Sequence, residues 1–250
     1  MTLALNGVSY SYGEKEALAN VTVAFEPNQL IALAGANGSG KSTLLKIAAR
    51  VHQPSSGMVS YEGRALREWP AKEYARSVGY LPQEAEPAFP MRAIEVVLSG
   101  RAPFLSRFAW EGESDIAAAK HALEICDAAH LVDRYLDEMS GGERKRVFLA
   151  RVLAGTPRVI LLDEPLAALD IAHVQQFSRL LREIVDRTRC TVVFASHDLN
   201  WAAAYSDRMI VMRDGKVALD STPAEVMRAE VVGELFGFEA RVADGWLVPR

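Results

Sequence analysis

Residues 30–43 read Leu30-Ile31-Ala32-Leu33-Ala34-Gly35-Ala36-Asn37-Gly38-Ser39-Gly40-Lys41-Ser42-Thr43. The first part is an apolar, strand-like run, the second is a glycine-rich turn, and the residues from Leu44 to Ala49 have the pattern of a helix. The stretch fits the phosphate-loop (P-loop) template G-x-x-x-x-G-K-[ST] in the strand-to-helix context that the template requires. It therefore predicts an α/β domain built around a P-loop.

The residue types of this loop suit a chain of phosphates. Glycine lets backbone N–H groups approach phosphate oxygens without obstruction, and the start of the following helix adds a favourable dipole. Lys41 is predicted to reach the β- and γ-phosphates, and the Ser42 hydroxyl is predicted to ligate Mg²⁺. A turn of glycine and serine is often only a flexible connection, but a lysine and a serine directly after its last glycine favour the phosphate site. We therefore predict that residues 35–43 bind a nucleoside triphosphate.

Length and composition allow one large domain with a sizeable core. The chain has 250 residues, 50% of them hydrophobic, and a net charge of −4, so no basic field predicts a nucleic-acid partner. The first residues lack the pattern of a signal peptide, and no run of about 18 apolar residues predicts a membrane span. Cys126 and Cys190 lack metal-ligand spacing and are expected to be buried free thiols. These features predict a soluble, cytoplasmic protein.

The N-terminal region has the alternating pattern of antiparallel strands. Residues 3–10 and 21–25 alternate apolar and polar side chains, and a loop around Tyr12 and Gly13 lies between them. Two interpretations of Tyr12 stay open on the residues alone. Its ring is either a plate that stacks on adenine or an ordinary aromatic side chain at the end of a sheet.

The middle of the chain contains an irregular, aromatic segment, Ala85–Trp110. Its prolines exclude long regular elements. Its aromatic residues are predicted to form either a docking surface or a small local core; they are Phe89, Phe104, Phe108 and Trp110. Helices are expected over residues 113–132 and 144–153, with the basic residues 144–146 on a solvated face.

Two continuous apolar runs deliver polar residues to one edge of a predicted sheet. Residues 159–162 and 191–195 are typical of parallel strands that are covered on both faces. The first run ends at Asp163 and Glu164 and the second is followed by His197, which is where α/β proteins place ligands.

Each of these polar residues has a catalytic and a structural interpretation. Asp163 is predicted to hold Mg²⁺, and Glu164 to polarise the water that attacks the γ-phosphate. Gln83, which follows the strand expected over 78–81, would reach the metal or the water, and His197 would contact the γ-phosphate. A surface glutamate and a core histidine are the alternatives.

Together with a further motif, these residues resemble the ATP-binding subunit of an ATP-binding cassette (ABC) transporter. Met139-Ser140-Gly141-Gly142-Glu143 resembles the family's signature motif, in which a leucine usually stands in place of Met139. Tyr12 matches the adenine-stacking aromatic, Gln83 the Q-loop glutamine and His197 the switch histidine. Ala168-Leu169-Asp170 matches the D-loop, whereas Leu166 stands where the family usually has threonine or serine.

The resemblance implies a fold and a mechanism. Residues 1–250 would form a single domain with a parallel core sheet, an N-terminal antiparallel β subdomain and a helical subdomain inserted at about 85–157. Two copies would pack head to tail and enclose ATP and Mg²⁺ between the P-loop of one copy and residues Ser140, Gly141, Gly142 and Glu143 of the other. ATP would hold the dimer together, and hydrolysis would release it and drive a membrane partner.

One further segment narrows the branch of the family. Gly100-Arg101-Ala102-Pro103-Phe104 is similar to a segment of the ATPases that serve iron-siderophore, haem and cobalamin importers. That branch implies polytopic permease subunits, indirectly a substrate-binding protein, and a peripheral location at the cytoplasmic face of the cell membrane. A soluble ABC ATPase of iron–sulfur cofactor assembly is the alternative, and a small-molecule kinase is disfavoured by the signature motif and Glu164.

Overall fold

The computed structural model describes residues 2–84, 89–106, 110–167, 169–237, 240–243 and 246–249, so Phe108 and Ala168 lie outside the described residues. The strands are β1 Leu3–Tyr12, β2 Lys15–Phe25, β3 Leu30–Ala34, β4 Ser56–Tyr61, β5 Arg64–Ala65, β6 Val78–Leu81, β7 Val159–Leu162, β8 Thr191–Ser196, β9 Arg208–Arg213, β10 Lys216–Ser221, β11 Ala240–Ala243 and β12 Trp246–Pro249. The helices are α1 Lys41–Ala48, α2 Ala71–Ser77, α3 Ala93–Ser99, α4 Glu113–Ile125, α5 Gly141–Ala154, α6 Ile171–Thr188, α7 Leu199–Tyr205, α8 Pro223–Val226 and α9 Ala229–Phe236. Short 3-10 turns cover Leu66–Glu68, Ala102–Phe104, Ala129–Leu131 and Leu136–Glu138.

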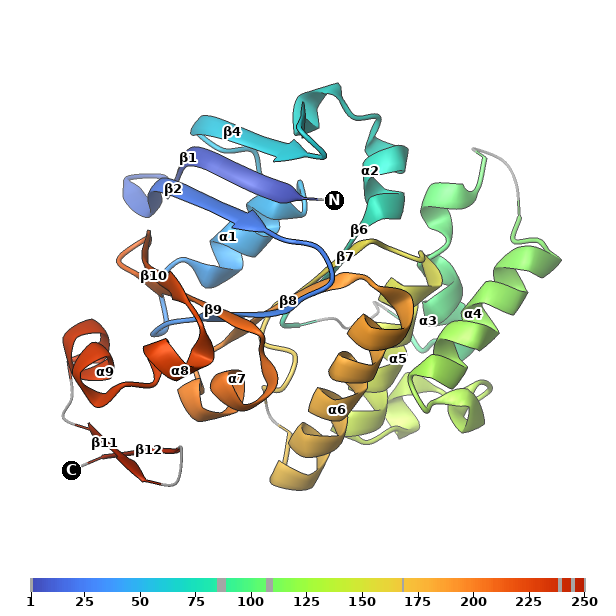
Figure 1. The fold of residues 1–250 in the computed structure, drawn as a ribbon. Coiled ribbons are helices and arrows are strands. Elements are labelled where there is room, and N and C mark those ends of the chain that lie inside the picture. The colour runs from blue at the N-terminus through green and yellow to red at the C-terminus, as the bar shows by residue number, and fades with distance from the viewer. Residues whose placement is uncertain are drawn as a thin grey trace.

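Two sheets form the body of the molecule (Figure 1). The larger one has the strand order β10-β9-β3-β8-β7-β6; its strands from β9 to β6 run parallel, and β10 is an antiparallel edge. The smaller one has the order β2-β1-β4-β5 and is antiparallel. The predicted α/β fold with a parallel core sheet and an N-terminal antiparallel sheet is thus confirmed.

Alternation along the central strands divides the core into two parts. In β3, Ile31 and Leu33 pack with α1 and the antiparallel sheet, whereas Leu30 and Ala32 face the cluster built by α3 to α7. Successive side chains of a strand point to opposite faces, so a run that is apolar throughout must be covered on both sides. The sequence of β3 therefore fixes the three-layer arrangement at the P-loop.

Helices α3, α4 and α5 lie between β6 and β7 in the chain and pack on one another beside the large sheet (Figure 1). The prediction of one helix over 113–132 was too long, because α4 ends at Ile125. Asp127 adopts a left-handed φ of 51°, and the N–H of Ala128 donates to the carbonyl of Leu123 at 2.8 Å. This is a Schellman ending, which usually has glycine at the left-handed position.

The state of the two cysteines and the length of the helices can also be compared with the predictions. Cys126 and Cys190 are buried and free, as predicted. Within the described ranges, every helix is too short or too polar to cross a lipid bilayer.

Candidate active site

The P-loop connects the end of β3 to the start of α1 through left-handed backbone positions. Gly35, Gly38 and Gly40 have φ values of 148°, 80° and 104°. A Cβ atom at Gly35 would lie 2.4 Å from the carbonyl oxygen of Met212, and one at Gly40 would lie 2.7 Å from that of Ala17. Only glycine fits at Gly35 and Gly40, because both the backbone conformation and the space exclude a side chain there.

Lys41 begins α1, and its ammonium group lies inside the loop. Nζ donates to the carbonyl oxygens of Gly35 at 2.8 Å and of Ala36 at 3.0 Å. Burial lowers the pKa of Lys41, and the carboxylates of Glu164 and Asp163 oppose that shift. The cation is therefore held where the predicted phosphates would lie, close to both carboxylates.

The next residue of the motif joins the P-loop to β7. The Ser42 hydroxyl donates to Oδ1 of Asp163 at 2.8 Å, and the Tyr80 hydroxyl lies 3.4 Å from Oδ2 of the same carboxylate. Burial raises the pKa of Asp163. A buried carboxylate beside a hydroxyl is an oxygen-donor pair that suits Mg²⁺, since a divalent cation would offset the cost of burying the charge.

A buried hydroxyl of the loop also fits a phosphate ligand. Among the described residues, Ser39 Oγ finds no hydrogen-bond partner, although its side chain is buried. Buried polar groups in proteins almost always have a partner. An anion in the glycine cradle would supply one, so the loop fits a phosphate group.

Glu164 lies between the two other predicted catalytic side chains. Nε2 of Gln83 donates to its Oε2 at 3.3 Å, and Nδ1 of His197 lies 3.6 Å from the same oxygen. Glu164 itself has a left-handed φ of 46°. The structure thus brings Gln83, Glu164 and His197 together at the carboxyl edge of β6, β7 and β8, next to Asp163.

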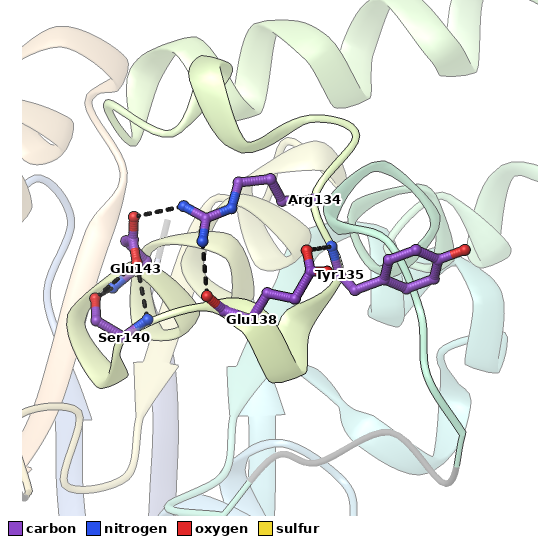
Figure 2. Close-up of polar contacts among 5 residues, drawn as sticks. All are labelled: Arg134, Tyr135, Glu138, Ser140 and Glu143. Carbon is purple, nitrogen blue, oxygen red and sulfur yellow. Dashed lines mark hydrogen bonds and ion pairs between the residues drawn. The ribbon is translucent and has the colours of Figure 1, made fainter.

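The signature residues form a capping box at the start of α5 (Figure 2). Oε2 of Glu143 accepts from the backbone N–H and the hydroxyl of Ser140, both at 2.8 Å, and Ser140 Oγ accepts from the N–H of Glu143 at 3.3 Å. Arg134 lies 3.4 Å from Glu143 Oε1 and donates to the carbonyl oxygen of Glu138 at 2.7 Å. The exposed Ser140 and Gly141 thus begin a helix, and within the described part of the chain no hydrogen bond engages the N–H groups of Gly141 and Gly142, which could therefore bind an anion.

The remaining predicted residues make contacts of their own. No hydrogen bond or ion pair among the described residues joins Ser140–Glu143 to the P-loop of the same chain. Asp170 caps α6 by accepting from the N–H of His173 at 3.0 Å. Tyr12 ends β1 and is 46% exposed, with its ring 4.9 Å from that of Tyr10 and 5.7 Å from that of His52, so its stacking role remains a prediction.

Some contacts of the site were not predicted. Tyr80 lies in a strand that gave no chemical signal, and only the folded sheet places it against Asp163. The solvated-face interpretation of residues 144–146 was wrong for Arg146, which donates to Asp127 Oδ2 at 2.6 Å and Gln176 Oε1 at 2.8 Å. Lys145 donates to the carbonyl oxygen of Gln83 at 3.3 Å. These contacts depend on tertiary packing, which helical periodicity does not show.

The sequence of the chain is similar to that of proteins whose family is known. The family profile described as ABC transporter matches residues 18–167. The hemin import ATP-binding protein HmuV of Vibrio cholerae is 38% identical over 250 residues, which cover 97% of this chain and 94% of that protein. The petrobactin import ATP-binding protein FpuC of Bacillus anthracis is 32% identical over 246 residues, which cover 97% of this chain and 89% of that protein.

The chain is also similar to a solved structure that contains bound nucleotide. It is a dimeric ATP-binding cassette in a post-hydrolysis state bound to ADP and Pi, and it matches this chain with a TM-score of 0.74 and 29% identity over 88% of this chain and 98% of that one. The matched profile spans the phosphate loop, the signature helix and the carboxylates after β7. The chain belongs to the ABC transporter family and is an ATP-hydrolysing subunit of such a transporter.

Proposed function

We propose that this ATPase powers a membrane importer for haem, and that two copies act head to tail with Mg²⁺ and ATP. The observation that supports the chemistry best is the convergence of Lys41, Asp163 and Glu164 at one edge of the sheet. The import of haem is supported by the 38% identity to a hemin import ATP-binding protein over nearly the whole chain.

The side chains have separate tasks in this proposal. Lys41 exchanges its two loop carbonyls for phosphate oxygens, while Ser42 and Asp163 would hold Mg²⁺, which supplies charge neutralisation on the phosphates. Glu164 takes the proton of the attacking water, and Gln83 and His197 orient its carboxylate from two sides.

The other half of each ATP site comes from a second copy. Ser140 and the N–H groups of Gly141 and Gly142 would bind the γ-phosphate held by the partner's P-loop. The solved dimeric cassette bound to ADP and Pi supports this arrangement. Because ATP would contact both copies and ADP only one, hydrolysis would open the dimer.

The importer would also contain polytopic permease subunits and, indirectly, a substrate-binding protein, with this chain peripheral at the cytoplasmic face of the cell membrane. Phe89 and Trp110 are 71% and 90% exposed and support a docking surface in the 85–110 segment. Phe104 is half-buried and makes contacts within the chain instead, because its ring lies 3.7 Å from the guanidinium of Arg101 and 4.8 Å from that of Arg76.

The testing experiment purifies the tagged chain from membranes in which it is expressed with its native partners. A polytopic protein should co-purify, raise the ATPase rate and support haem uptake into proteoliposomes, and Glu164→Gln should abolish uptake while keeping the complex. Capture of soluble proteins only would favour iron–sulfur assembly. Uptake of an iron-siderophore but not haem would favour the second cargo, which the 32% identity to a petrobactin import protein supports.

A further inference from the structure

The second signature glycine is covered by a histidine of another helix. Gly142 is buried, and a Cβ atom added to it would lie 2.5 Å from Cδ2 and 3.2 Å from Nε2 of His173. The ring therefore occupies the space directly over the Gly142 backbone. A Cβ atom at the neighbouring Gly141 would meet nothing within 4 Å.

Asp170 fixes the orientation of this ring. Its Oδ2 lies 2.8 Å from Nδ1 of His173, and its Oδ1 accepts from the backbone N–H of His173 at 3.0 Å. The bond at Nδ1 points the opposite edge of the imidazole, with Cδ2 and Nε2, at Gly142. The Asp170 carboxylate thus caps α6 and also orients the His173 side chain, which extends from α6 onto α5.

A second contact joins the same two helices further along. Arg146, one turn after Gly142 in α5, donates to Gln176 Oε1 in α6 at 2.8 Å. The first turn of α5 is therefore seated on the first turn of α6, and Figure 1 shows the two helices side by side. Figure 2 shows a further contact of the same turn, the pairing of Arg134 with Glu143.

We propose that His173 is a positioning residue for ATP hydrolysis, which fixes the Gly141 and Gly142 N–H groups in the place where the partner's ATP meets them. The inference rests on the proposed role of the signature half-site. A helix start binds an anion through amides that must converge on it, so a tilt of the first turn of α5 weakens that site without touching the P-loop. His173 and Asp170 would thus link the D-loop and the signature within one chain.

The first test uses Glu164→Gln chains, in which ATP holds the dimer, and measures the ATP concentration for half-maximal dimer formation by sedimentation velocity. Adding His173→Ala should raise that concentration about tenfold, while the affinity of the separate monomer for a fluorescent ATP analogue stays unchanged. His121→Ala, on the exposed face of α4, is the matched control. Unchanged dimer formation in His173→Ala would overturn the proposal.

Two substitutions separate packing from hydrogen bonding. His173→Phe keeps a ring over Gly142 without the Asp170 bond, and His173→Asn keeps a donor for Asp170 without the ring. The phenylalanine variant should resemble the parent more than the alanine variant does, and the asparagine variant should resemble alanine. The reverse order would also overturn the proposal, and both variants remain informative if alanine does not fold.

The last test is a steric rescue. Gly142→Ala should lower the Tm of the monomer, and adding His173→Ala should restore it, whereas Gly141→Ala should show no such rescue. The absence of rescue at Gly142 would contradict the packing seen here. Ser140→Ala distinguishes the proposed signature half-site from the proposed role of His173. Intact ATP-dependent dimerisation in Ser140→Ala would contradict the signature half-site. A dimerisation defect in Ser140→Ala together with normal dimerisation in His173→Ala would contradict only the role of His173.

Discussion

Glu164 accepts a hydrogen bond from Gln83 and lies 3.6 Å from His197, so its carboxylate is held from two directions. Replacing it by glutamine keeps the shape and removes the proton acceptor. We expect Glu164→Gln to lower the rate of ATP hydrolysis about 10²–10⁴-fold, with ATP binding retained. Phosphate release and equilibrium binding measure the two effects, and hydrolysis at the parent rate would refute the role of Glu164 as general base.

Lys41 is the only basic residue of the P-loop motif at residues 35–43, and its Nζ already lies among the loop carbonyls. Lys41→Ala should weaken ATP binding and hydrolysis together, because the cation would contact the phosphates in both the ground state and the transition state. Isothermal titration with ATP and a steady-state assay test this. Lys120→Ala on the exposed face of α4 is the control, and an undiminished ATP affinity of Lys41→Ala would contradict the phosphate role.

At the scale of the element, the start of α4 depends on one carboxylate. Asp115 accepts from Nε of Arg101 at 2.8 Å and from the N–H of Gly112 at 3.1 Å, and these bonds hold its pKa below the ordinary 3.8. A carboxylate with a lowered pKa stabilises the native state above its ordinary pKa, and that stabilisation is lost as the pH falls through the lowered value.

Asp115→Asn should therefore lower the free energy of unfolding at pH 7 and make it less dependent on pH below about 4. Urea unfolding at neutral and acid pH measures both effects. Asp186→Asn, at an exposed position of α6, should leave the pH dependence as it is. An identical acid dependence in Asp115→Asn and the parent would show that the Arg101 contact does not matter for stability.

The sequence predicted the elements that carry the site but not all their ends. The apolar runs at 159–162 and 191–195 predicted β7 and β8, because burial on both faces leaves a plain signal in the residues. The end of α4 was missed because Asp127, and not glycine, takes the left-handed position there.

At the scale of the whole molecule, the C-terminal hairpin is attached to the helix that follows His197. Asn200 of α7 donates to the carbonyl oxygen of Leu247 at 3.2 Å and accepts from its N–H at 2.7 Å, and Leu247 is buried. Asn200→Ala leaves two backbone groups without partners, which costs about 1–3 kcal/mol each where they are buried. We expect faster proteolysis of β11–β12 and a lower Tm.

Limited proteolysis with mass spectrometry locates the cut, and Asn6→Ala at an exposed position of β1 is the control. Equal cleavage rates in the two variants would show that the hairpin is held by other contacts, such as the apolar packing of Leu247.

The candidate site was predicted as far as it is encoded in short motifs. The P-loop, Asp163 and Glu164 are each adjacent to a recognisable strand, so their place at the sheet edge follows from the order of residues. Tyr80 and His173 lie far in the chain from the groups that they touch, Asp163 and Gly142. Their roles arise only from the pairing of β6 with β7 and from the seating of α5 on α6, which no local pattern contains.

The left-handed backbone of Glu164 has a consequence for how this protein would change under selection. A residue other than glycine in that conformation costs on the order of 1 kcal/mol, and glycine adopts it freely. Replacement by glycine would relieve the backbone and remove the proposed general base in one step. Selection for stability alone would therefore favour glycine at this position and yield an inactive chain. Retention of the glutamate would require selection for ATP hydrolysis itself.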